Sequence, residues 1–159
     1  MNMAVQRFEW SDEYSVGIPQ LDAQHRQIID LLGEFKACVD GAEAGKLVAA
    51  ALNKVNAYAR FHLEREELLL RVRGYPEYAG HKAEHDAYRQ KVATLQSQWM
   101  RRDIAIRIAN FLSEWWRYHI LTSDQQYARF FRRLAATRPL VLAPVAPKAP
   151  VKAPSRSPA

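Results

Sequence analysis

Apolar residues recur at three- and four-residue steps along most of this chain, which is the periodicity of amphipathic helices. In the first periodic segment the apolar positions are Ile28, Leu31, Leu32, Phe35 and Val39. Four long segments follow this pattern, and almost nothing follows the two-residue alternation of a strand. We therefore predict helices over about residues 21–39, 47–72 and 78–100, and a fourth from about residue 103 past His119 to about residue 134.

Short connections between these segments predict how the helices are arranged. Gly41 and Gly45 mark a turn after the first segment, and Gly74 followed by Pro76 is a common stop signal after the second. Helices of about 20 residues joined by short connections pack as antiparallel neighbours. We predict an all-α fold, an up-down-up-down antiparallel four-helix bundle, with the first twenty residues forming an aromatic-rich N-terminal arm over it.

The last residues of the chain have a different composition. Six of the eight prolines lie between Pro139 and Pro158, interleaved with Ala, Val and Lys. Such a segment cannot form a helix and buries little apolar surface. We therefore predict a bundle domain over residues 1–136 and a disordered Pro/Ala/Lys tail over residues 137–159, which offers a contact for a protein partner.

Charge and composition narrow the class of protein. Half of the net charge of +6 comes from Lys148, Lys152 and Arg156 in the tail, so the bundle carries a mixed surface and no basic face for nucleic acid. No apolar run reaches the ~18 residues that a membrane-spanning helix needs. The start of the chain lacks a secretory signal, and Cys38, the single cysteine, has no partner within the chain. We expect a cytoplasmic protein without a membrane partner.

The histidines are the candidate chemical groups. His81 and His85 are four residues apart and share one helix face, and His62 and Glu66 repeat this spacing on another helix. Glu67 is expected to lie on the exposed side. A lone histidine on a helix is usually a hydrogen-bonded core or surface residue. Here each predicted helix carries at least one, as a metal site in a bundle core requires; the five are His25, His62, His81, His85 and His119.

Asp124 is a further candidate ligand, five residues after His119. Five residues correspond to about 500° on an ideal α-helix, which leaves the two side chains roughly 140° out of phase. In one interpretation Ser123 or Asp124 caps a new helical turn, since Ser123 and Gln126 have the spacing of a capping box. In the other, a local distortion such as a π-bulge turns Asp124 toward the histidines. The geometry of the sequence leaves both interpretations open.

The chain resembles the bacteriohemerythrins over residues 8 to about 131. The pieces that carry this resemblance occur in order along the four predicted helices, and no histidine is left over. They are Val16-Gly17-Ile18 with Leu21-Asp22-Ala23-Gln24-His25, Phe61-His62-Leu63-Glu64-Arg65-Glu66-Glu67, Gly74-Tyr75-Pro76 with His81-Lys82-Ala83-Glu84-His85, and Trp115-Trp116-Arg117-Tyr118-His119-Ile120 with Asp124.

The resemblance implies a non-heme di-iron centre with an oxo or hydroxo bridge. It implies that one iron is held by His81, His85 and His119, and the other by His25 and His62. Glu66 and Asp124 would bridge the two irons. One coordination position would stay open for dioxygen, with Trp116 and Ile120 beside that pocket.

The expected function is reversible binding of dioxygen, for oxygen carriage, storage or delivery, and we expect no enzymatic activity. A second hypothesis is an interaction domain that senses oxygen, nitric oxide or redox state and signals through the tail. A third is a di-iron oxidase. Carboxylate-rich di-iron enzymes of the ferritin type use Glu-x-x-His pairs, and no histidine here has a Glu three residues before it, which makes the third hypothesis the weakest.

Two positions depart from the family pattern. Gly33 lies in the first helix where many members have Asn, and a glycine inside a helix costs up to ~1 kcal/mol relative to alanine. Trp116 stands where the family commonly has Leu, three residues before His119. Residues three apart are neighbours on a helix. The Trp116 ring therefore either adds bulk on the face of His119, near the ligand pocket, or rotates into the core beside Trp115.

Overall fold

The computed structural model describes residues 8–41, 45–99 and 103–137, and these residues form helices without any strand. Four long helices follow a short 3₁₀ turn, Asp12–Tyr14, and the fourth continues through a π-helix into a last α-helix. Their bounds are α1 Pro19–Asp40, α2 Gly45–Val72, α3 Tyr78–Gln96, α4 Ile104–His119, η2 Ile120–Asp124 and α5 Gln125–Thr137. The predicted all-α class is confirmed.

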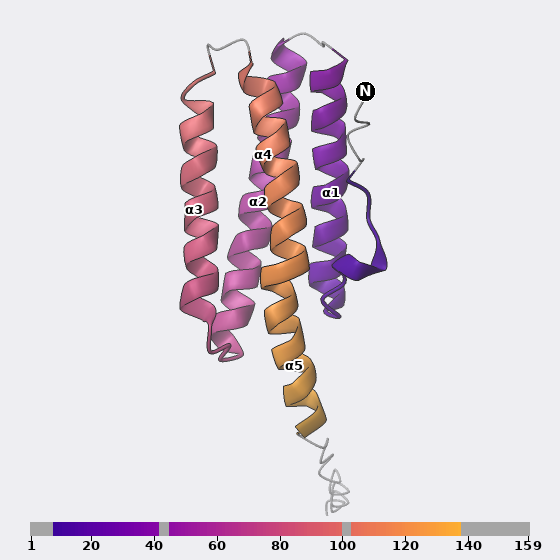
Figure 1. Cartoon of the computed structure of the whole chain (residues 1–159), viewed down its shortest axis with the longest axis vertical. Helices are drawn as coiled ribbons and strands as arrows, with labels where there is room; N and C mark the ends of the chain where they lie inside the picture. The colour runs from indigo at the N-terminus through magenta and orange to yellow at the C-terminus, as the bar shows by residue number, and fades with distance from the viewer. Residues whose placement is uncertain (1–7, 42–44, 100–102, 138–159) are drawn as a thin grey trace, which may run out of the picture.

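The four long helices run antiparallel and form a bundle with up-down-up-down topology (Figure 1). Each packs against two neighbours, α1 against α2 and α4, and α3 against α2 and α4. The helix α5 continues the direction of α4 and extends beyond the end of α2 and α3 (Figure 1). The short connections predicted this arrangement, because they permit only adjacent antiparallel helices.

The ends of α2 and α3 show what stops each helix. Gly74 has φ +67°, and the Tyr75 amide donates to Leu70 O over 2.9 Å, while the Gly74 amide donates to Arg71 O over 3.2 Å. This is a Schellman ending, which favours glycine because the conformation is left-handed, as predicted. The helix α3 ends at Gln96, four residues before the predicted end. The amides of Gln98 and Trp99 bond three residues back, which tightens the chain into turns.

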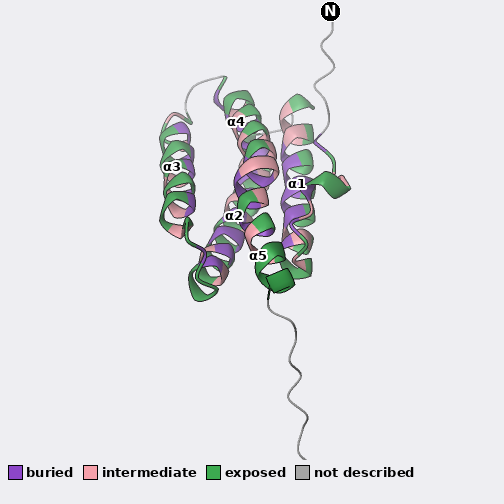
Figure 2. Ribbon diagram, turned by 60° about the horizontal axis from the view of Figure 1, so that its bottom comes forward, coloured by how far each residue is buried: buried purple, intermediate pink, exposed green. Residues whose placement is uncertain are grey.

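Buried residues form stripes along the inward sides of the helices (Figure 2). A large apolar cluster fills one part of the interior, with Phe35, Val55, Leu63 and Leu112 at its centre. A smaller cluster lies near the junction of α5 with the bundle and comprises Val16, Leu21, Leu70, Tyr75, Tyr127 and Ala128. The buried polar residues contact both clusters, as described below, so an apolar environment surrounds them on both sides.

The N-terminal arm packs on the bundle over the part that the structure describes. Phe8 and Tyr14 are buried in the large cluster, with their ring centroids 5.4 Å apart. Asp22 fixes the entry into α1, since its carboxylate accepts hydrogen bonds from the Ser15 hydroxyl (2.7 Å) and the Val16 amide (2.8 Å). The predicted arm is confirmed for residues 8–18. The predicted tail lies outside the described residues, apart from Thr137, which ends α5.

Among the described helices, none combines the length and the apolar character that crossing a bilayer requires.

Candidate metal centre

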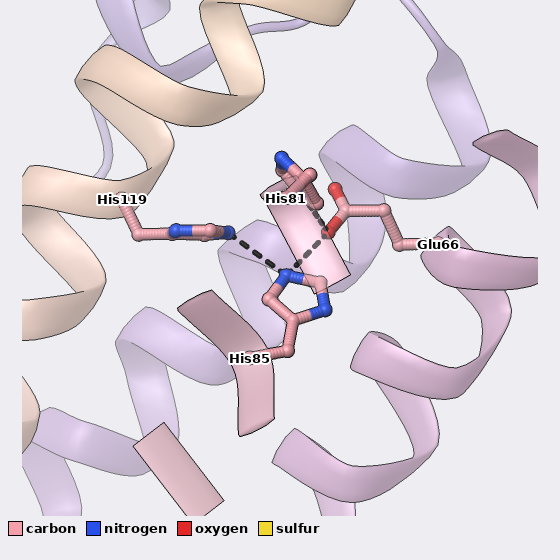
Figure 3. Close-up of side chains that lie close together, drawn as sticks. All are labelled: Glu66, His81, His85 and His119. Carbon is pink, nitrogen blue, oxygen red and sulfur yellow. Dashed lines mark hydrogen bonds and ion pairs between the residues drawn. The ribbon is translucent and has the colours of Figure 1, made fainter. Parts of the chain in front are cut away.

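Seven predicted ligand residues meet inside the bundle, and all are buried, with His81 the most exposed at 5%. His25 comes from α1, and His62 and Glu66 from α2, one turn apart. His81 and His85 come from α3, His119 ends α4, and Asp124 ends the π-helix. Figure 3 shows Glu66, His81, His85 and His119 pointing toward one another from α2, α3 and α4. The structure thus brings together every residue predicted to ligate metal.

Three histidines form one side of the site. The Nε2 atoms of His85 and His119 lie 2.9 Å apart, and the His81 and His85 rings meet edge to face, with centroids 4.6 Å apart. These three histidines and Glu66 each place one ligand atom within 4.8 Å of the others. His25, His62 and Glu66 form a second group by the same measure. Glu66 therefore belongs to both groups.

The two carboxylates divide their oxygens between the groups. Glu66 Oε2 lies 3.1 Å from His81 Nε2 and 3.2 Å from His85 Nε2, while Oε1 lies 3.9 Å from His62 Nε2. Asp124 Oδ1 lies 3.1 Å from His119 Nε2, and Oδ2 lies 3.4 Å from His25 Nε2. One oxygen of each carboxylate thus faces each histidine group, which is the arrangement of a bridging ligand.

The π-helix explains how Asp124 reaches the site. Residues Ile120–Asp124 form a wider turn than an α-helix, with hydrogen bonds that span five residues. A residue five positions after His119 therefore returns to the same face. The capping interpretation is wrong, since the Ser123 hydroxyl donates to Glu84 Oε2 on α3 (2.5 Å). Of the two alternatives that the sequence left open, the structure contains the π-bulge.

Hydrogen bonds at Nδ1 orient three of the imidazoles. His62 donates to the amide oxygen of Gln24 (3.0 Å), His85 to Glu67 (2.9 Å), and His119 to Glu84 (3.1 Å). An Nδ1 atom that carries the proton leaves Nε2 with a lone pair directed into the site. Such partners commonly fix the tautomer and ring orientation of histidines that ligate metal.

Several buried atoms in the site lack a hydrogen-bond partner within the described part of the chain. They are both nitrogens of His25, Nε2 of His62 and both oxygens of Asp124. Buried polar atoms without partners are costly and rare. A cation at the centre would satisfy the lone pairs of the inward nitrogens and the carboxylate oxygens together. The donor set of imidazoles and carboxylates suits iron, so these residues fit a metal centre.

The titration of the site without metal depends on burial and on the carboxylates. Burial, with a smaller contribution from the charge of His25, lowers the pKa of His62 to about 3. Burial also lowers the pKa of His119, but Asp124 and the hydrogen bond to Glu84 outweigh it and raise that pKa to about 10. The hydrogen bond from His119 lowers the pKa of Glu84 to about 2, against the opposing effect of burial. Glu84 is therefore an anion at neutral pH.

Aromatic rings cover the histidines on the side of the large apolar cluster. Trp115 stacks on His119, with centroids 4.3 Å apart and planes at 13°. Trp116 is fully buried and meets the His62 ring edge to face at 5.4 Å, and its indole N–H donates to the Tyr88 hydroxyl (3.2 Å). Of the two orientations of Trp116 that the sequence left open, the structure contains the one in the core beside Trp115, with ring centroids 5.2 Å apart, and Trp115 is the ring that stacks on His119.

Five residues around the site were missed or misplaced from the sequence. Glu67 was expected to be exposed, yet its side chain is 13% exposed and bonds both His85 and Arg89. The Tyr127 hydroxyl donates to Glu66 Oε1 (2.6 Å). The others are Gln24, Glu84 and Trp115. Only adjacency could have indicated Gln24, beside His25, and Glu67, beside Glu66. Glu84 contacts a histidine 35 positions away, and no sequence spacing indicates that contact.

Comparison with known proteins agrees with this geometry. The family model described as hemerythrin HHE cation binding domain matches residues 16–131. A bacteriohemerythrin of Stenotrophomonas maltophilia is 32% identical over 75% of this chain and 78% of its own length. Bacteriohemerythrins of Clostridium acetobutylicum and Methylococcus capsulatus are 26% and 28% identical, covering 76% and 72% of this chain and 98% and 88% of their own lengths. This chain therefore belongs to the hemerythrin family.

Proposed function

We propose that this protein binds dioxygen reversibly at a non-heme di-iron site, for oxygen carriage, storage or delivery. One observation carries the proposal, the division of the Glu66 and Asp124 oxygens between the two histidine groups. Two carboxylates that each face both groups are suited to two cations held side by side. A single ion held by His81, His85 and His119 would leave His25 and His62 without a metal, and their buried Nε2 atoms without partners among the described residues.

In this proposal one iron takes His81, His85 and His119, and the other takes His25 and His62. Glu66 and Asp124 contribute to both irons. The second iron therefore receives one protein ligand fewer than the first. Open coordination positions on non-heme iron are the usual place where dioxygen binds. The smaller number of protein ligands therefore favours binding of dioxygen to the iron beside His25 and His62.

The bound irons would donate electrons to dioxygen, while the side chains of this protein would form the surroundings of the bound molecule. Trp116 and Ile120 are both fully buried in the large apolar cluster, each with 0% exposure. Trp116 contacts His62 directly. The buried Trp116 ring beside His62 would exclude water and proton donors there, which favours release of the bound molecule as dioxygen over further reaction.

The test is an optical titration of the iron-loaded, reduced protein. We expect a visible band that appears on exposure to dioxygen and disappears when dioxygen is removed, over repeated cycles. Glu64→Gln, at an exposed position of α2 whose side chain is 65% exposed, is a matched control and should behave as the parent. Consumption of dioxygen with permanent loss of the band would indicate an oxidase, and the absence of any band would contradict dioxygen binding.

A further inference from the structure

The Nδ1 atoms of four of the five histidines have unequal surroundings. His85 and His119 donate to the carboxylates of Glu67 and Glu84. His62 donates to the neutral amide oxygen of Gln24. His25 Nδ1 is buried without a partner in the described part of the chain. Two anionic acceptors thus lie behind one histidine group, and none of the described Nδ1 partners behind the other group is charged.

An anionic acceptor changes the imidazole that donates to it. Hydrogen bonds to ionised groups are roughly twice as strong as those between neutral groups. A carboxylate on Nδ1–H therefore increases the electron density at Nε2 and makes the imidazole a more basic ligand. A more basic ligand stabilises the higher charge of a ferric ion relative to a ferrous ion. The amide oxygen of Gln24 has this effect only weakly.

The two carboxylates differ in how far their charge is compensated. Arg89 donates to Glu67 Oε1 over 2.6 Å and pairs with Asp86 as well, so a cation offsets much of the Glu67 charge. Glu84 has the neutral Ser123 hydroxyl as its other described partner. The Glu84 side chain is 47% exposed, so water rather than an arginine screens its charge, and no described lysine or arginine pairs with it.

We propose that these hydrogen bonds make the two irons electronically unequal, with the iron of His81, His85 and His119 oxidised first. The inference rests on the two-iron assignment of the proposed function. Glu84 is then a positioning residue that acts through His119. In the state oxidised by one electron, the ferric ion lies on the side of His119. The iron beside His25 and His62 stays ferrous until the second electron is removed.

The experiment is an anaerobic electrochemical titration of the iron-loaded protein, in which the electrode accepts one electron in each of two steps. Mössbauer spectra of the half-oxidised sample report whether ferric and ferrous ions are distinct. Glu84→Gln keeps the shape and a hydrogen-bond acceptor but removes the charge. We expect this variant to raise the first midpoint potential by at least about 59 mV, which is a tenfold change in the equilibrium constant of a one-electron step. The second midpoint potential should stay nearly unchanged.

Two further variants give opposite expectations. Gln24→Glu places an anion behind His62, so it should lower the second midpoint potential and narrow the gap between the steps. Ser123→Ala removes the hydroxyl that donates to Glu84 and partly compensates its charge, so it should lower the first midpoint potential. This variant also tests the role of Glu84 if Glu84→Gln takes up too little iron to be titrated. Glu64→Gln is the control. A first potential unmoved by both Glu84→Gln and Ser123→Ala, or a Gln24→Glu effect on the first step alone, would overturn the proposal.

Failure of this inference and failure of the proposed function give different results. The titration uses no dioxygen, so unequal irons with an irreversible dioxygen reaction would contradict reversible binding and support this proposal. Equal irons with reversible binding would do the opposite. Both proposals assume two irons per chain, and iron analysis of each sample tests this assumption. One iron per fully loaded chain would overturn both proposals.

Discussion

His85 and His119 face each other through their Nε2 atoms, 2.9 Å apart, while each donates its Nδ1 proton to a carboxylate. If both Nε2 atoms were unprotonated, their lone pairs would repel each other at this distance. A cation or an added proton between the two nitrogens removes this repulsion. A metal ion and a proton therefore compete for the same position.

Metal uptake by the metal-free protein should release protons, and His119 should be a main source. The pKa of His119 is raised to about 10, because Asp124 and Glu84 outweigh the effect of burial. Below that pH the metal must displace a proton, so affinity should rise with pH, by about tenfold per unit for each proton released. His62, with its pKa lowered to about 3, is already neutral at pH 7 and should release none.

Adding ferrous iron anaerobically to weakly buffered metal-free protein, with an indicator dye, measures this release. Glu84→Gln removes a carboxylate that raises the pKa of His119, so this variant should release fewer protons at pH 8. A release that is independent of both pH and Glu84 would show that His119 is neutral before the metal binds.

The purified, fully loaded protein should hold close to two irons per chain. Five histidines and two shared carboxylates provide ligands for two ions, and they form two groups of ligand atoms that share Glu66. Metal analysis together with protein quantitation by amino-acid analysis gives the ratio. A value near one that further iron does not increase would contradict the two-iron assignment.

Replacing Glu66 by glutamine should cost iron binding far more than the same change at Glu64. Glu66 is fully buried and faces both histidine groups, whereas Glu64 is exposed and pairs with Arg60 on the helix surface at 4.0 Å. The matched comparison is iron retained after dialysis against a chelator. We expect Glu66→Gln to lose most of its iron and Glu64→Gln to retain parental content. Equal retention by the two variants would mean that Glu66 is not a ligand.

Trp116→Leu should open the side of the site at His62. The indole touches the His62 ring and is fully buried, so a smaller residue leaves space for water and anions. We expect faster azide binding to the oxidised protein, faster autoxidation and little change in iron content. The packing cost should be roughly 2–4 kcal/mol, by comparison with other large-to-small core substitutions.

Tyr88→Phe separates packing from access at Trp116. It removes the oxygen that accepts the indole N–H but keeps the ring, so it should lower stability by about 1–3 kcal/mol with an azide rate close to the parent. Urea unfolding and stopped-flow azide binding are measured on both variants. If Trp116→Leu binds azide at the parental rate, Trp116 does not restrict access.

Gly33→Ala should stabilise the protein by up to about 1 kcal/mol, the helix-interior difference between the two residues. Gly33 is exposed within α1, and a Cβ there would meet no atom within 4 Å. Gly74→Ala is the contrasting variant, because the left-handed φ of +67° strains any L side chain although space is available. Thermal unfolding should shift upward for Gly33→Ala and downward for Gly74→Ala. A destabilised Gly33→Ala would indicate a role for Gly33 that its surroundings do not explain.

The bundle and the ligand pairs His62–Glu66 and His81–His85 were predictable because both rest on local spacing, whereas Asp124 entered the ligand set only through the resemblance to the bacteriohemerythrins. A three- and four-residue apolar period determines which face of each helix is inward, and His81 and His85 share such a face by the same rule. Gly74 and Pro76 predicted the end of α2 through local backbone preferences alone. These features require no knowledge of which helices become neighbours.

The remaining features depend on contacts between helices. Asp124 faces the site only because the chain widens into a π-helix, and ideal α-helical phase places it on another face. Glu67 carries a charge that suggests exposure, yet Arg89 on α3 compensates it. Trp115 and Trp116 are adjacent aromatic residues, and only the positions of Tyr88 and His62 determine which ring covers which histidine.

Glu66 holds the two halves of the site together, and this has a consequence for how the site fills. Its Oε2 faces one histidine group and its Oε1 the other, while the Tyr127 hydroxyl restrains the rotation of the carboxylate. The first ion to bind must fix both oxygens at once, so it prepares the place of the second. Loading should therefore be cooperative: at half-saturating iron, chains with two ions or none should outnumber chains with one.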